Sequence, residues 1–450
     1  MSDARVDDLL SLDRDVARAS TALARWRSKL ARDPAEHADD DPLAPVRRVA
    51  GKSTWDALRE LSPPAAEVPL RDALIPWVAA LTLARLVHED DVAWARAAAE
   101  ARVPFQGEPP RLVSWRDAWR GVVTVRSAGE AGLWLAAAGD VGESLASIAR
   151  TRAEKRGEIA RRFGRDHAWE LLDVGATATI RAAARRLLDA TEDLARAVWK
   201  DARGGAAEVL HGAVGREASE GWPAHLARRW LEEIFGVALA GLKVELPPLP
   251  VALGAASFQR ALYDLGFATR LAAAPTAMPF ALAREPGARA AHRLGFVFGA
   301  LGADVEWQIR TLGLGRRAAL RQARVLARTA LLDARLHAAR LLLAPDAISP
   351  PRDLFDEVTQ RLFGLPLDAR LQGAWPAARD DEPARFVALV EALPFTEALR
   401  DRFDLDWFRN PRAWAHVRAI SAVPAAEPHD AKVLDAGADR LARAFEGALG

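Results

Sequence analysis

Hydrophobic residues recur along most of the chain at intervals of three and four, the spacing that places them on one face of an α-helix. Residues 6–26 follow this period, with Asp and Arg between the apolar positions. Helix-forming Ala, Leu, Arg and Glu dominate, and only the short stretches 120–125 and 242–246 favour a strand. The pattern predicts an all-α protein with very little β structure.

Proline and glycine mark where the predicted helices end. The sharpest boundary is 246–250, because its three prolines cannot continue a helix. Ser127 and Glu130 have the spacing of a capping box and predict a helix that opens over 131–138. No repeat of fixed period occurs, which argues against a solenoid. The longer helices are predicted at about 142–163, 176–202, 255–273, 288–311, 316–343, 381–403 and 432–449.

Composition narrows the possible functions. The chain has 450 residues, half of them hydrophobic, and no Cys, which excludes disulfides, thiolate metal sites and a Cys nucleophile. Its 62 basic and 61 acidic residues give a net charge of +1, which argues against a nucleic-acid partner. The longest apolar stretch, 73–87, is short and contains Arg85, so we expect no membrane span. With an acidic N-terminus that lacks an apolar signal segment, we expect a cytoplasmic protein.

The common catalytic motifs are missing. No two of the nine His residues are four apart, so the HExxH pattern, which places two imidazoles on one metal, does not occur. The phosphate-binding motif GxxxxGK[ST] and the nucleophile motif GxSxG are absent as well. The acidic runs Asp39-Asp40-Asp41 and Asp380-Asp381-Glu382 are predicted to be solvated caps.

Three segments, in this order, carry a resemblance to a known family: 257–266 (SFQRALYDLG), 275–280 (PTAMPF) and 291–301 (AHRLGFVFGAL). They resemble the active-site region of the thimet oligopeptidase/oligoendopeptidase F zinc metallopeptidases, in which an HExxH helix is followed by a loop and a helix that bears a third ligand, a Glu. The resemblance implies two helical lobes flanking a central groove. We therefore expect an N-terminal lobe at 1–165, a metallopeptidase-like core at 166–420 and a C-terminal helix at 421–450.

The resemblance also assigns the family's functional positions. The first metal ligand falls on Phe258, the general base on Gln259, the second ligand on Leu262 and the third on His292. Phe and Leu cannot bind a metal, and the amide of Gln259 has no useful basicity. A single His does not make a zinc site, which needs three or four protein ligands. The resemblance therefore implies that the zinc site is lost and that no cofactor is bound.

The family's Tyr and His donors from a late helix should lie near 384–386. The single Tyr of this chain is Tyr263, inside the former metal helix, and no His lies near residue 385. We therefore expect a catalytically inactive pseudopeptidase that binds a peptide or a protein partner, such as an active paralogue. The residues expected to line its groove are Gln259, Tyr263, His292, Phe296 and Glu306.

Two alternatives stay open. The first is a zinc-independent oligopeptidase or another hydrolase with a rebuilt site, for which His292, Gln259, Asp264 and Glu306 supply the candidate groups. The second is a purely structural helical scaffold whose groove has closed.

Overall fold

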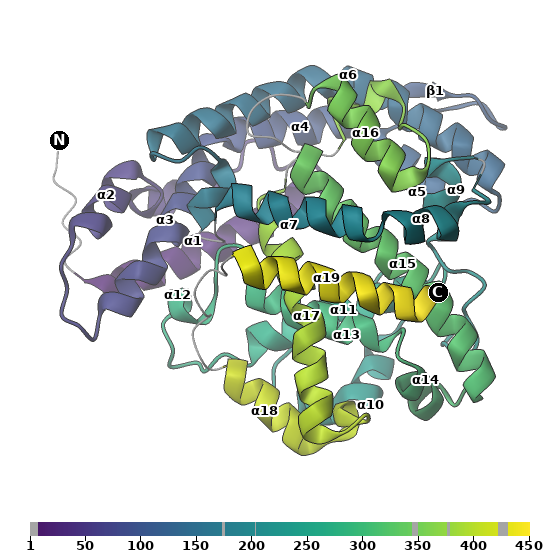
Figure 1. Cartoon of the computed structure of the whole chain (residues 1–450). Helices are drawn as coiled ribbons and strands as arrows, with labels where there is room; N and C mark the ends of the chain where they lie inside the picture. The colour runs from purple at the N-terminus through teal and green to yellow at the C-terminus, as the bar shows by residue number, and fades with distance from the viewer. Residues whose placement is uncertain (1–7, 173–175, 203, 344–349, 376–378, 422–430) are drawn as a thin grey trace.

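The computed structural model describes residues 8–172, 176–202, 204–343, 350–375, 379–421 and 431–450. Helices dominate it (Figure 1), so the predicted all-α class is confirmed. Within the described residues the strands are β1 (Val103–Phe105) and β2 (Arg111–Val113), an antiparallel pair in which Val103 lies opposite Val113.

The first part of the chain builds one end of the molecule. The 35-residue helix α6 is its longest element, and α3 and α4 pack against it. The elements are α1 (Leu9–Leu30), η1 (Ala44–Val49), α2 (Lys52–Glu60), α3 (Val68–Leu86), α4 (His88–Glu100), α5 (Trp115–Thr124), α6 (Ala128–Arg162) and η2 (Ala168–Leu172).

Among the remaining helices, α13 packs between α11 and α17, and α15 packs against α7 and α16. Helix α19 lies beside α7 across the front of Figure 1 and also packs on α15 and α17. The elements are α7 (Thr177–Ala190), α8 (Glu192–Trp199), α9 (Ala206–Gly212), α10 (Arg228–Leu239), α11 (Ala255–Ala272), α12 (Phe280–Ala283), α13 (Arg289–Leu301), α14 (Val305–Leu312), α15 (Arg316–Leu343), α16 (Arg352–Phe363), η3 (Ala369–Leu371), α17 (Glu382–Phe403), η4 (Trp407–Arg409), α18 (Pro411–Ser421) and α19 (Ala431–Leu449). Of the predicted segment 421–450, residues 422–430 lie outside the described residues.

Local capping chemistry explains several boundaries. Ser127 accepts a hydrogen bond from the Glu130 backbone N–H, as its spacing predicted, but the helix begins at Ala128 and continues unbroken to Arg162. Asp304 caps α14 by accepting from the Trp307 N–H at 2.8 Å. Gly313 ends α14 with a φ of 69°, a left-handed conformation that glycine adopts without steric cost.

Two element predictions were wrong. Residues 120–125 lie mainly in α5, whose N-terminus a capping box between Ser114 and Asp117 stabilises. Residues 242–246 form no strand. The predicted helix 288–311 is also divided, because Gly302, Ala303 and the cap residue Asp304 separate α13 from α14.

Buried apolar residues form several cores. One core joins α6 to α7, α15 and α19, and a second joins α1, α3 and η2. The third core contains α11, α13 and α14 and is rich in aromatic rings. No helix in the described part of the chain is long and apolar enough to cross a lipid bilayer.

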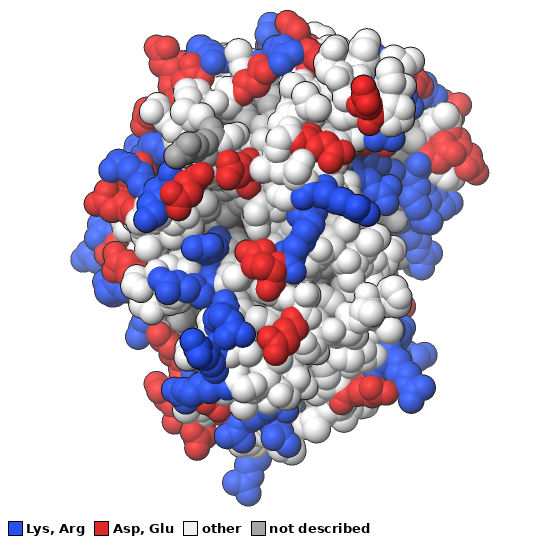
Figure 2. All heavy atoms as spheres, turned by 90° about the vertical axis from the view of Figure 1, so that its right-hand side faces the viewer, with Lys and Arg blue, Asp and Glu red and all other residues white. Residues whose placement is uncertain are grey.

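The surface carries both signs of charge. Figure 2 shows acidic and basic side chains interspersed over one face, around a central area with few charged residues. Many of the charges are paired on their own helix at a spacing of four residues, as Arg228 is with Glu232 and Arg229 with Glu233. Other pairs join different helices, as Arg186 of α7 does with Asp439 of α19.

Candidate functional site

Helices α11 and α13 pack closely against each other and form the base of the site. A Cβ atom at Gly266 of α11 would lie only 2.4 Å from the Leu294 carbonyl oxygen of α13. A Cβ atom at Gly295 would lie 2.9 Å from the ring of Tyr263. The two glycines therefore allow the backbones to approach so closely that side chains on the facing surfaces meet directly.

Tyr263 of α11 and His292 of α13 meet across this contact. The Tyr263 hydroxyl lies 2.6 Å from His292 Nδ1, and both side chains are buried. Phe267, one turn after Tyr263, places its ring centroid 4.9 Å from that of His292. Tyr263 and Phe267 thus occupy positions i and i+4 on one face of α11, directly against His292.

Asp381, the residue before α17, completes a chain of polar contacts. Its Oδ2 lies 3.4 Å from His292 Nε2, at the other side of the ring from Tyr263. Arg379 and Arg385 donate to the same carboxylate at 3.1 and 2.9 Å. Burial alone would raise the pKa of Asp381, but the hydrogen bond from His292 and the two guanidinium groups hold it far below its usual range.

The electrostatics fix the protonation of the pair. Burial lowers the pKa of His292 to about 4, although Asp381 opposes this shift. Burial raises the pKa of Tyr263 to about 12. At neutral pH the hydrogen-bond network therefore assigns a protonated phenol that donates to Nδ1 and a neutral imidazole whose Nε2–H donates to Asp381.

A second buried pair lies beside the first. His337 of α15 makes a short hydrogen bond through Nδ1 to Glu382, whose carboxylate also lies 3.8 Å from Arg379 and 4.0 Å from Arg340. Burial would raise the pKa of Glu382, but His337 and the two guanidinium groups lower it. The ring of Phe296 separates the two pairs, since it packs edge-on against both Tyr263 and His337.

The prediction that Asp380, Asp381 and Glu382 are solvated caps was wrong. Asp380 pairs with Arg156 and Arg27 of the N-terminal helices, while Asp381 and Glu382 face the two histidines. The carboxylates point inward because each contacts a cation or an imidazole there. These contacts offset the free energy lost when the carboxylate charge is removed from water.

The structure separates Phe258 and Leu262 from His292. Phe258 stacks on Trp222 with ring centroids 4.5 Å apart, in the aromatic core that also contains Trp307. Leu262 belongs to the same core and is fully buried. The side chains that contact His292 from α11 are those of Tyr263 and Phe267 instead, about one helical turn further on.

The residues expected in the groove come together only in part. Of that set, Tyr263, His292 and Phe296 come together, and Gln259 lies half-buried on α11, with its side chain near Gly302. Glu306 pairs with Arg310 on its own helix, α14, at 3.6 Å. Asp264 is buried and binds Arg260 at 3.0 Å; burial raises the pKa of Asp264 and Arg260 opposes this.

Sequence reasoning missed Phe267, Asp381 and Arg385. Phe267 and Asp381 contact His292, while Arg385 binds Asp381 and lies over the ring of Tyr263 at 6.0 Å. The resemblance placed a late helix near the site at 384–386, and this was the one signal that pointed toward Arg385. It did not show that Arg385 is the residue that reaches the site, or that the group there is a cation.

Comparison with known proteins supports the fold. No protein-family model and no curated protein matches the sequence. The structure resembles that of a Bacillus anthracis (strain Ames) protein assigned as an oligoendopeptidase F, with a TM-score of 0.55 and 11% identity over 90% of this chain and 84% of the other. A comparison with oligoendopeptidase F from Enterococcus faecium gives a TM-score of 0.48 and 10% identity over 98% and 96%. The chain thus shares the all-helical fold of oligoendopeptidase F.

The residues at this site do not fit the zinc ion that such a fold implies. Two zinc-binding imidazoles on one helix face would stand at i and i+4, the spacing of Tyr263 and Phe267 here. Phe267 has no donor atom, and with a pKa of about 12 the Tyr263 phenol keeps its proton at neutral pH. The described residues contain no group of three His, Asp or Glu side chains that could hold a metal ion.

Proposed function

We propose that this chain is a catalytically inactive, peptidase-like protein that acts by binding a peptide or a protein partner. One observation carries the proposal: both ring nitrogens of His292 are engaged, Nδ1 by the Tyr263 hydroxyl and Nε2 by Asp381. A neutral imidazole has a single nitrogen lone pair with which to bind a metal or accept a proton. Here that lone pair faces the phenol, so the imidazole has no free acceptor for either task.

Packing around His292 supports the same proposal. Phe267 covers the imidazole from α11, and His292 retains only 2% of its exposure. A general base must come within hydrogen-bond reach of the proton that it removes. A protein with this peptidase-like fold can still bind a partner even though Phe267 covers His292. An active peptidase of the same fold is one partner that we propose.

A matched pair of double variants tests the proposal. We expect Tyr263→His combined with Phe267→His to create a three-imidazole site with His292 and to bind Zn²⁺ stoichiometrically, as measured by mass spectrometry after gel filtration. The control, Phe258→His combined with Leu262→His, has the same spacing on the face that points to Trp222 and should bind substoichiometric zinc. Zinc in the control variant alone would contradict the assignment of Tyr263 and Phe267 to the metal face.

The unmodified chain provides the second arm. We expect it to bind no stoichiometric zinc and to leave a quenched peptide library uncleaved, while individual peptides raise fluorescence anisotropy on binding. Stoichiometric zinc, or hydrolysis that His292→Ala abolishes, would overturn the proposal in favour of a rebuilt hydrolase. If the chain cleaves none of the peptides, binds none of them and does not bind a purified active peptidase of this fold, the proposal is overturned in favour of a structural scaffold.

A further inference from the structure

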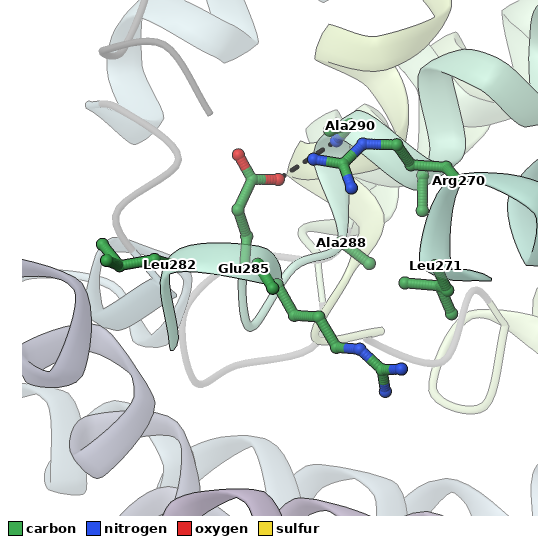
Figure 3. Close-up of a pocket in the computed structure, with 9 residues that line it drawn as sticks. Arg270, Leu271, Leu282, Glu285, Ala288 and Ala290 are labelled. Carbon is green, nitrogen blue, oxygen red and sulfur yellow. Dashed lines mark hydrogen bonds between the residues drawn. The ribbon is translucent and has the colours of Figure 1, made fainter. Parts of the chain in front are cut away.

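A surface pocket lies next to the Tyr263–His292 pair. Its lining includes Ala291, the residue before His292, but neither Tyr263 nor His292 itself. It contains about 290 Å³ of empty space, part of it open to solvent. Its walls are the last turn of α11, helix α12 with the loop after it, and the first turn of α13, and its lining includes Arg270, Leu271, Arg284, Glu285 and Ala291. Figure 3 shows Arg270 reaching from α11 toward the start of α13.

Arg270 is an unusual lining residue. Only 7% of it is exposed, yet it forms no hydrogen bond or ion pair with any described residue. Burial lowers the pKa of Arg270, as do the nearby cations Arg293 and Arg284, and Glu285 offsets only part of this. The five donor hydrogens of Arg270 therefore remain available to an acceptor that enters the pocket.

The carboxylates around the pocket already have partners. Glu285 accepts from the Ala290 backbone N–H at 3.0 Å, drawn as a dashed line in Figure 3, and lies 3.7 Å from Arg289. Glu391 lies 3.4 Å from Arg293 and 3.9 Å from Arg289. Of the four arginines at 270, 284, 289 and 293, Arg289 and Arg293 pair with these carboxylates and Arg284 lies over the ring of Phe280, whereas Arg270 has no such partner among the described residues.

The N-terminus of α13 also favours an anion in this pocket. Ala288 precedes the helix with no side-chain cap, so the first backbone N–H groups depend on other acceptors. Glu285 satisfies Ala290, whereas Ala291, which also lines the pocket, has no capping partner among the described residues. The positive end of a helix dipole and a buried guanidinium thus face the same small space, an arrangement that favours an anion.

We propose that this pocket binds an oxyanion group, a carboxylate or a phosphate, through Arg270 and the N-terminus of α13. The planar guanidinium can donate two parallel hydrogen bonds to either group. The pocket is small and partly open to solvent, so it takes the oxyanion group itself and leaves the rest of a larger ligand outside. This site is separate from the proposed loss of metal chemistry and does not depend on it.

Arginine protection on the full chain tests the proposal without a variant. Phenylglyoxal modifies accessible guanidinium groups, and peptide mass spectrometry reads the rate at Arg270. We expect inorganic phosphate, succinate or a short Glu-rich peptide, each up to about 10 mM at constant ionic strength, to slow modification of Arg270 severalfold and to leave the exposed Arg229 unchanged. The probe that protects best identifies the source of the oxyanion. No protection by any probe would overturn the proposal.

A variant separates a binding role from a structural one. In buffer without oxyanions, Arg270→Met should unfold at the same or a higher temperature than the parent chain, because it removes an unpaired buried charge. Its affinity for the protecting anion, measured by calorimetry, should fall at least about tenfold, whereas the control Arg229→Met should keep both properties. A lower unfolding temperature with unchanged anion affinity would show a structural pair with Glu285 and would refute the site.

Discussion

The polar chain from Tyr263 through His292 to Asp381 shows how one buried imidazole can be held neutral. Burial penalises the charged ring, and two partners of opposite hydrogen-bonding character select one tautomer. Asp381 keeps its negative charge because Arg379 and Arg385 share it. The same residues therefore fix both the geometry and the charge of the site.

This arrangement predicts that acid destabilises the protein through His292. Its pKa is about 4 in the folded chain and ordinarily 6.5, so the unfolded chain takes up the proton first. The free energy of unfolding should hold steady above pH 6.5 and then fall by about 3 kcal/mol as the pH drops toward 4. Urea titrations across this range measure the slope. His292→Gln should flatten this slope, whereas His225→Gln, at an exposed position, should leave it unchanged. Equal slopes in the parent chain and both variants would contradict the lowered pKa of His292.

At the scale of helices, the close approach of α11 and α13 depends on glycine. Gly266→Ala would place a methyl group 2.4 Å from the Leu294 carbonyl oxygen, and backbone cannot move aside cheaply. We expect a loss of about 3 kcal/mol in the free energy of unfolding. Gly132→Ala in α6 meets nothing within 4 Å and should gain about 0.5–1 kcal/mol from better helix propensity. Similar values for the two variants in chemical denaturation would argue against a tight contact.

The same helices show what the sequence could predict. The bounds of α11, α15, α17 and α19 follow from apolar periodicity and from the prolines and glycines that flank them. Periodicity could not distinguish which face of α11 meets α13, since Phe258, Leu262, Tyr263 and Phe267 are all apolar or aromatic, and this choice decides which residues contact His292. Nor could it show that Asp381 points inward, because that depends on Arg379 and Arg385 gathering around a ring from another helix.

Across the whole molecule, polar contacts join the first helices to the later core. Asp13 of α1 accepts from the Phe280 and Ala281 backbone N–H groups of α12, both at 2.8 Å. Trp77 of α3 donates to the Arg284 carbonyl, and Trp169 of η2 to that of Arg379. These bonds link the N-terminal helices to the segments that carry the pocket and Asp381.

We therefore expect Asp13→Ala to destabilise the entire chain. It leaves two backbone N–H groups without an acceptor and should lower the free energy of unfolding by about 2–4 kcal/mol. Circular dichroism and tryptophan fluorescence should still report one coincident transition in urea. The highly exposed Asp193→Ala should change stability by less than about 0.5 kcal/mol. Separate transitions for the two probes would indicate that the N-terminal helices unfold independently.

The position of Tyr263 makes the site unusually open to spectroscopy. It is the only tyrosine of the chain, and its hydroxyl bonds directly to His292. Biosynthetic incorporation of fluorotyrosine would therefore give a single fluorine resonance, without background from elsewhere in the protein. The chemical shift of that resonance would report ionisation of the His292 imidazole, binding of a ligand nearby and separation of α11 from α13. All three events change the surroundings of the Tyr263 ring.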